Sequence, residues 1–164
     1  MKSRSLLIGL FLVAGCIDAS SDGLIGGEAP EFAARTLSGD SLRLSELRGN
    51  PILLNIWATW CIPCRKEMPE LEALHKTYAA RGLRVIGVSV DEGSADDAVR
   101  AYTKEFGITY TILRDPGELV SAVFTVPGVP ATFLIDRDGR VRWRHLGPFT
   151  SENPELQSAL KAAL

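Results

Sequence analysis

The chain has 164 residues, of which 46% are hydrophobic, enough for one hydrophobic core but hardly for two. Its 18 basic and 20 acidic residues give a formal net charge of −2, and because binding to phosphate backbones needs a basic excess, we expect no nucleic-acid partner. With 15 glycines and 9 prolines, the chain is also too poor in these residues for a low-complexity protein. The composition predicts a single globular domain.

The first fifteen residues have the composition of an export signal. Lys2 and Arg4 precede an unbroken apolar run at 6–14, which has the length of a secretory hydrophobic region and is too short to span a bilayer. The run ends in Ala14-Gly15-Cys16, which resembles the lipobox of bacterial lipoproteins. This resemblance implies cleavage before Cys16 and a lipid on its sulfur, whereas an ordinary signal peptide or an uncleaved anchor is the alternative. We therefore predict a signal at 1–15 and a lipid anchor at Cys16.

Two hairpin strands are predicted to follow a tether. Residues 16–27 are small, polar and glycine-rich, which is typical of a flexible linker. The stretches 32–35 and 41–44 are separated by a turn around Gly39 and predict a short hairpin.

The remaining elements alternate between strands and helices. Apolar and β-branched runs predict strands, and apolar residues at spacings of three and four predict helices, the first of them kinked at Pro69. Strands are expected at 51–58, 83–90, 110–113, 131–135 and 140–146, and helices at 63–81, 95–106, 116–124 and 151–163. Strand–helix alternation implies parallel pairing, while the tight turn at 136–139 makes the last two strands antiparallel. The predicted fold is therefore α/β with a mixed central sheet.

The chemistry is concentrated where the first buried strand meets the first long helix. Cys61 and Cys64 are three residues apart at the expected helix N-terminus, where unpaired N–H groups and the helix dipole favour a thiolate. Cys61 is predicted to be the nucleophile and Cys64 the resolving thiol that lies deeper in the first turn. Between them, Ile62 and Pro63 are expected to tune the redox poise of the pair.

The spacing of the two cysteines is compatible with other roles. A structural disulfide or half of a zinc site would also use Cys-X-X-Cys, but a second pair of ligands at suitable spacing is absent from the sequence. Copper binding without catalysis is kept as the non-enzymatic alternative. We expect no metal and no cofactor in the redox reaction.

Two motifs resemble the thioredoxin-like family, and more closely its exported, membrane-anchored thiol-disulfide oxidoreductases of the TlpA and ResA type. The motifs are 55–67, which contains the cysteines, and 128–136, and the likeness covers residues 28–164. The resemblance implies a thioredoxin fold with an N-terminal hairpin and an insertion at 91–109. It also implies that Pro130 is a cis-proline facing the cysteines and that the Val129 backbone can pair with a substrate strand.

One departure from cytosolic thioredoxin concerns proton transfer. The resemblance places Asn55 where small thioredoxins carry a buried Asp, and Asn cannot titrate. Glu67, one helical turn after Cys64, is the position where the exported branch carries a Glu, and we predict that it exchanges the proton during catalysis. A solvated surface residue is the alternative. We expect Trp60 to line the substrate groove and Trp57 to belong to the core.

The predicted function is a lipid-anchored, extracytoplasmic reductant of disulfides in exported proteins, supplied with electrons by a membrane donor. The resemblance suggests apocytochrome c as a client, in cytochrome c maturation. The opposite direction, disulfide formation in exported thiol proteins, is the enzymatic alternative because the reduction potential sets the direction. We expect a monomer.

Overall fold

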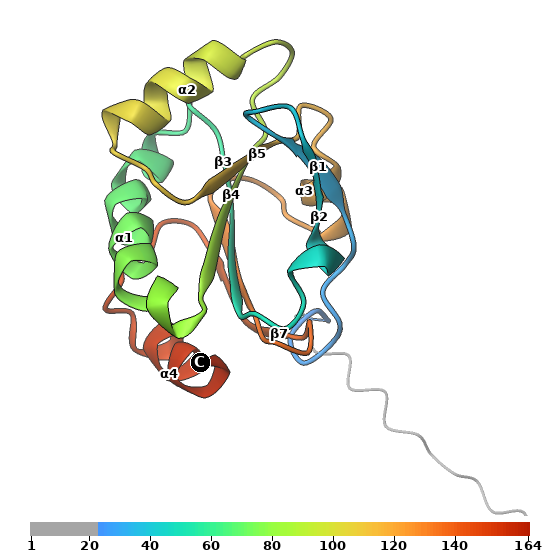
Figure 1. The fold of residues 1–164 in the computed structure, drawn as a ribbon, viewed down its shortest axis with the longest axis vertical. Helices are drawn as coiled ribbons and strands as arrows, with labels where there is room; N and C mark the ends of the chain where they lie inside the picture. Colours follow the sequence, from blue (N-terminus) through green and yellow to red (C-terminus); the bar gives the residue numbers. More distant parts are fainter. Residues whose placement is uncertain (1–22) are drawn as a thin grey trace, which may run out of the picture.

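The computed structural model describes residues 23–164 (Figure 1). The predicted signal at 1–15 and Cys16 lie outside the described residues. In the order of the chain, the strands are β1 (Ala33–Thr36), β2 (Ser41–Arg43), β3 (Ile52–Trp57), β4 (Arg84–Ser89), β5 (Thr111–Arg114), β6 (Ala131–Ile135) and β7 (Val141–Leu146). The α-helices are α1 (Ile62–Tyr78), α2 (Asp96–Glu105), α3 (Leu119–Val123) and α4 (Pro154–Ala163), and short 3-10 helices cover Leu44–Leu47 and Ala79–Arg81.

The seven strands form one mixed sheet in the order β2-β1-β5-β4-β3-β6-β7. Strands β3, β4 and β5 run parallel, whereas β6 pairs antiparallel with β3 and β7 antiparallel with β6. The predicted mixed α/β fold is confirmed, including the hairpin of β1 with β2 around Gly39, whose φ of 100° suits glycine. Figure 1 shows α1 and α4 on one side of the sheet and α3 on the other.

The central strands are buried on both faces, as expected for strands covered by helices. Every residue of β3 and β6 is buried. Trp57 points toward α2, where its ring stacks on Tyr102 at 5.0 Å between centroids, which confirms Trp57 as a core residue. On the opposite face, Phe133 of β6 packs against Phe124, which follows α3. The two strands β3 and β6, which adjoin the cysteine motif and the Pro130 loop, are therefore covered on both faces of the sheet.

Two predicted helix starts are wrong because side-chain caps fix later ones. The helix expected from Pro116 begins at Leu119, since Glu118 has a left-handed φ of 53° and the Asp115 carboxylate caps the helix by accepting the Val120 N–H at 2.7 Å. The last helix begins at Pro154 instead of Ser151.

Asn153 caps that last helix by accepting the Leu156 N–H at 3.0 Å. Ser151 belongs to the preceding turn, where its N–H donates to Glu70 on α1 at 2.7 Å. Strand β2 is also one residue shorter than expected, because Leu44 begins a 3-10 helix.

The first described residues lie against the start of β7. The Gly26 N–H donates to the Val141 carbonyl at 2.8 Å, and the backbones of Glu28 and Arg140 form an isolated antiparallel β-bridge. Because Ile135 pairs with both Val141 and Ile52, this contact is at the edge of the sheet where β3 begins. The cysteine motif follows the end of β3, so the described chain starts at the edge opposite to the cysteines.

Candidate functional site

The two cysteines of the motif are at the N-terminus of α1, as the sequence predicts. Cys61 is the N-cap residue and Cys64 is in the first turn, and their sulfurs form a disulfide with 5.3 Å between the Cα atoms. The Cys64 N–H also points at Cys61 Sγ over 3.2 Å. A backbone donor at a helix N-terminus stabilises a thiolate on Cys61 when the bond is reduced.

The loop before β6 faces this disulfide. The Val129–Pro130 peptide bond is cis, and the Val129 carbonyl oxygen lies 3.7 Å from Cys61 Sγ. Pro130 leads directly into β6, which pairs with β3, the strand that precedes the cysteine motif. The two motifs of the sequence, far apart along the chain, therefore meet at one end of the sheet.

Exposure differs sharply within the motif. Cys61 is only 3% exposed and Cys64 is fully buried, whereas the side chains on either side of Cys61 are open to solvent, Trp60 at 66% and Ile62 at 73%. Large exposed apolar side chains are typical of surfaces that bind another protein. Of the two bonded cysteines, Cys61 is therefore the one with some solvent exposure, and it lies beside an apolar surface.

Beneath the disulfide, Glu67 is buried and does not lie on a solvated helix face. It is 1% exposed, accepts a hydrogen bond from the Thr132 hydroxyl at 3.1 Å and is 3.4 Å from Asn55 Nδ2. Asn55 Nδ2 donates to Thr132 Oγ1 at 2.9 Å as well. Asn55 on β3 and Thr132 on β6 are register partners, so their side chains share the face that α1 covers.

Burial dominates the ionisation of this glutamate. Removal from water raises the pKa of Glu67 to about 8, and the hydrogen bonds from Thr132 and Asn55, which favour the carboxylate, only partly oppose that rise. A carboxyl group with such a pKa matches a free thiol, whose pKa is about 8.5, so a proton can pass between them with little free-energy change. Glu67 lies one turn after Cys64 on the buried face of α1.

Sequence reasoning missed Thr132 as a member of this cluster. Its signal was the second motif, in which a polar residue interrupts an otherwise apolar strand two positions after Pro130. It also left Asp91 without a role, although its carboxylate accepts the Thr59 N–H at 3.0 Å just before the cysteines.

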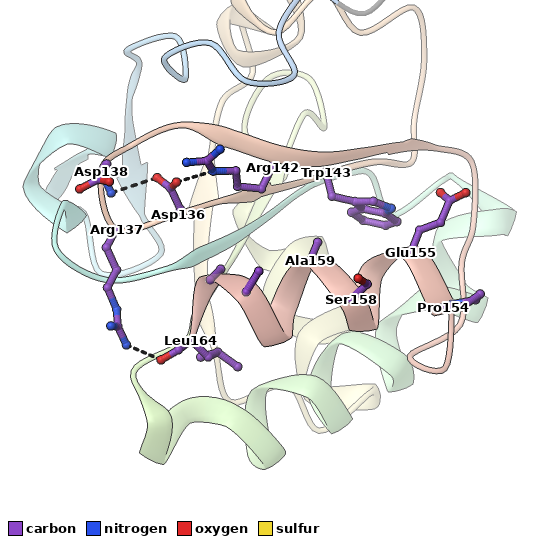
Figure 2. Close-up of a pocket in the computed structure, with 12 residues that line it drawn as sticks. Asp136, Arg137, Asp138, Arg142, Trp143, Pro154, Glu155, Ser158, Ala159 and Leu164 are labelled. Carbon is purple, nitrogen blue, oxygen red and sulfur yellow. Dashed lines mark hydrogen bonds and ion pairs between the residues drawn. The ribbon is translucent and has the colours of Figure 1, made fainter.

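A separate groove of about 970 Å³ lies between β7 and α4 (Figure 2). Trp143 and Ala159 line it, and one end carries Asp136 and Arg142, which form an ion pair. Asp136 follows the end of β6, so this end is at the edge of the sheet opposite to the disulfide. Among residues 23–164, no group of three or more His, Cys, Asp or Glu side chains is arranged to hold a metal ion.

Comparison with known proteins agrees with this site. Residues 25–144 match the AhpC/TSA family. A thiol-disulfide oxidoreductase ResA from Bacillus thuringiensis (strain Al Hakam) is 34% identical over 154 residues, covering 94% of this chain and 87% of the relative. The thioredoxin-like protein YneN of Bacillus subtilis (strain 168) is 37% identical over 131 residues, covering 79% of this chain and 76% of the relative.

A solved structure shows the same fold. The thiol:disulfide interchange protein of the thioredoxin family from Chlorobium tepidum TLS superposes with a TM-score of 0.70 at 32% identity, covering 83% of this chain and 94% of that structure. With a cysteine pair bonded at a helix N-terminus opposite a cis-proline, the chain belongs to the thioredoxin-like AhpC/TSA family and is a protein thiol-disulfide oxidoreductase.

Proposed function

We propose that the protein reduces disulfides in exported proteins, with Cys61 as the attacking thiol and Cys64 as the resolving thiol. The observation that carries the assignment is the difference in access: Cys61 borders an exposed apolar surface and Cys64 is fully buried. A bulky protein disulfide can approach only the former. The Val129 backbone, opposite Cys61, is available to an extended substrate strand.

The reaction proceeds through a mixed disulfide. The Cys61 thiolate attacks one sulfur of the partner's disulfide, and the other partner sulfur leaves as a thiolate that takes up a proton. Cys64 then gives its proton to the ionised form of Glu67, and its thiolate attacks Cys61 Sγ. The second partner sulfur leaves as a thiolate and takes up the proton that Glu67 gives back. The partner has gained two electrons and two protons, and the Cys61–Cys64 disulfide has formed.

The environment of the pair does not by itself set the direction. A strong oxidant has a reduced form that is stabilised as a thiolate, and the Cys64 N–H at the helix N-terminus stabilises such a thiolate on Cys61. The reducing direction is therefore supported by the resemblance to the TlpA and ResA type, and the reduction potential tests it.

Location and clients belong to the same proposal. The apolar run at 6–14 and Cys16 support export and a lipid anchor, so the enzyme would act outside the cytoplasm and receive electrons from a membrane donor. Among residues 23–164, no helix combines the length and the apolarity that crossing a membrane requires. The resemblance to the TlpA and ResA type supports apocytochrome c as a client.

The first experiment is a redox titration of the Cys61–Cys64 pair against glutathione, with Cys16→Ser in the background so that only one pair reacts. A potential near the value of thioredoxin, about −270 mV, supports the reducing direction. A potential near about −120 mV overturns it and assigns disulfide formation instead. A disulfide peptide that contains Cys-X-X-Cys-His then tests the cytochrome client class.

A trapping experiment assigns the two thiols. In the proposed mechanism Cys64→Ser accumulates a mixed disulfide with the peptide, because the attacking thiol remains and the resolving thiol is gone. Cys61→Ser forms none. The reverse result would exchange the two roles.

A further inference from the structure

A second buried polar network lies beside the cysteine motif and takes no part in the mechanism above. Thr59 follows β3, Asp91 follows β4, and Arg114 is the last residue of β5. These three strands are parallel, so their carboxyl ends meet at one edge of the sheet, the edge that carries the disulfide. Asp91 and Arg114 are each only 4% exposed.

The Asp91 carboxylate takes both hydrogen bonds that Thr59 can donate. The Thr59 N–H lies 3.1 and 3.0 Å from the two carboxylate oxygens, and the Thr59 hydroxyl donates to Oδ1. Ser89 at the end of β4 donates its hydroxyl to Oδ2 at 2.7 Å. One buried carboxylate therefore holds the residue two positions before Cys61, in a loop closed by the Cys61 N–H on the Ala58 carbonyl at 3.2 Å.

Arg114 holds Asp91 in place without bonding its carboxylate, through the Ser89 hydroxyl and the Asp91 backbone carbonyl. Its Nη1 donates to Ser89 Oγ at 2.8 Å and to the Asp91 carbonyl at 3.0 Å, and its Nε pairs with Asp96 at the start of α2 at 2.9 Å. A buried carboxylate or guanidinium costs free energy unless its hydrogen bonds are made. Here those hydrogen bonds are directed at the strand ends and at the loop that presents the nucleophile.

We propose that Asp91 is a positioning residue for Cys61, acting through Thr59 and held in place by Ser89 and Arg114. The inference rests on the proposed role of Cys61 as the attacking thiol. Attack on a disulfide needs the sulfur in line with the bond it breaks, and a displacement of about 1 Å costs up to about a hundredfold in rate. Cys61 Sγ also depends on the loop for its distances to the Cys64 N–H and to the Val129 carbonyl.

The variants separate positioning from charge and from stability. Asp91→Ala removes every hydrogen bond to Thr59. Asp91→Asn removes the charge and keeps one oxygen that accepts from the Thr59 hydroxyl, but its amide NH2 group at the Oδ2 position would face the Thr59 N–H as a second donor. Thr59→Val removes only the hydroxyl contact, and Thr77→Val is its control, because the Thr77 hydroxyl bonds the Ala73 carbonyl on the exposed surface of α1.

Asp136 provides the matched control for the buried carboxylate. It is 8% exposed, accepts the N–H groups of Asp138 and Arg140 at 3.0 and 2.9 Å, and pairs with Arg142 (Figure 2). It lies at the edge of the sheet opposite to the cysteines. Asp136→Ala therefore removes a comparable network without touching the motif.

The measurement uses the full chain, with Cys16→Ser in all variants, in the reduced state. Stopped-flow mixing with a chromogenic aromatic disulfide gives the rate constant of thiolate attack against pH, and the midpoint of the profile gives the thiol pKa. A change of one pKa unit alters the plateau at high pH by only about threefold, so a larger loss reports geometry. We expect the plateau of Asp91→Ala to fall at least about tenfold and those of Asp91→Asn and Thr59→Val about threefold, with Asp136→Ala and Thr77→Val within about twofold of the wild type.

Two results overturn the proposal. If Asp91→Ala keeps the wild-type plateau and loses only stability, as Asp136→Ala is expected to do, the network has a structural role and does not position Cys61. If Asp91→Ala does not fold, an unchanged plateau for Thr59→Val leads to the same conclusion. Failure of the proposed function has a different signature, since Cys61→Ser would then keep the attack that Cys64→Ser loses.

Discussion

The Thr132 hydroxyl donates to Glu67 over 3.1 Å, although 65 positions separate the two residues in the sequence. Glu67 lies three residues after Cys64, and Thr132 two residues after the cis-proline. The contact therefore joins the helix that carries the disulfide to the strand that begins at Pro130. It also fixes a buried carboxyl group at a defined place below the cysteines.

Glu67 should make the stability of the fold depend on pH. The folded protein keeps the Glu67 proton up to a pH of about 8, whereas a glutamate in the unfolded chain releases it near 4.5. Between these values the folded state binds more protons, so the free energy of unfolding falls as the pH rises. At about 1.4 kcal/mol for each pKa unit, the loss is on the order of several kcal/mol.

Urea unfolding of the oxidised protein at pH 5, 7 and 9 checks this expectation. In Glu67→Gln, the fall of the free energy of unfolding between pH 5 and 9 that Glu67 causes in the wild type should be absent. The control is Glu152→Gln, at an exposed position in the turn before α4, which should show the same fall as the wild type. Parallel pH profiles for the wild type and Glu67→Gln would mean that Glu67 ionises normally.

Glu67→Gln should also slow the release of the substrate. A glutamine cannot take the proton of Cys64, and general-base catalysis is worth about 10² to 10⁴ in rate. Because only a minority of Glu67 is ionised at pH 7, we expect decay of a preformed mixed disulfide there to slow by about tenfold and its inflection near pH 8 to be lost. The control is Glu70→Gln. Glu70 lies one turn after Glu67 on α1, and its carboxylate accepts the Ser151 N–H and does not belong to the buried cluster.

Asn55→Asp should turn the buried cluster into a pair of carboxyl groups. Because Asn55 Nδ2 is 3.4 Å from Glu67 Oε2, two charges there would repel each other, and the pair should hold one proton well above pH 8. The expected result is a larger loss of urea stability from pH 6 to 9 than in the wild type. Asn55→Leu, which carries no charge, should not show that additional slope.

The exposed side chains beside Cys61 should matter for protein substrates only. Trp60→Ala and Ile62→Ser remove apolar surface that is already open to solvent, so unfolding free energies should change by no more than about 0.5 kcal/mol. Exchange with a disulfide-bearing peptide or protein should slow, by about tenfold for Trp60→Ala, while exchange with oxidised glutathione stays near the wild-type rate. Equal losses with both substrates would point to damage of the cysteine pair itself.

Gly87→Ala should test how tightly the sheet packs under the motif. A Cβ at Gly87 would lie 2.9 Å from Ile112 Cδ1, so the end of the Ile112 side chain must move, and 3.0 Å from Trp57 Nε1, which is a very tight contact with a buried ring. Overpacking of this kind costs about 1 to 3 kcal/mol. Gly117→Ala is the matched control because its Cβ would meet nothing within 4 Å and its φ is not left-handed. Urea midpoints of the two variants give the comparison.

Periodicity predicted the type of every main element, because apolar spacing reflects which face is buried. Errors arose where a polar side chain decides the boundary. The carboxylate of Asp115 and the amide of Asn153 cap α3 and α4 later than the apolar patterns indicate. Such caps depend on backbone dihedral angles that composition does not encode. One example is the left-handed φ of Glu118 just before α3.

For the site, the sequence predicts what is local. The spacing of Cys61 and Cys64 is visible in the motif itself, and the resemblance supplied the cis geometry at Pro130 that the structure confirms. The buried partners are not local: Thr132 meets Glu67, and Asp91 meets Thr59, only because strands distant in the chain are neighbours in the sheet. Neither contact has a signature in spacing.

The contact of Gly26 with Val141 fixes the place where the chain enters the domain. This entry point and the disulfide lie at opposite ends of β3. If residues before 23 attach to a lipid bilayer, as proposed, the point of attachment is on the side of the domain away from the cysteines. Soluble clients would then reach Cys61 without passing the attachment point, and a membrane-bound electron donor would need either a domain that extends past the body of the enzyme or a linker that lets the enzyme turn.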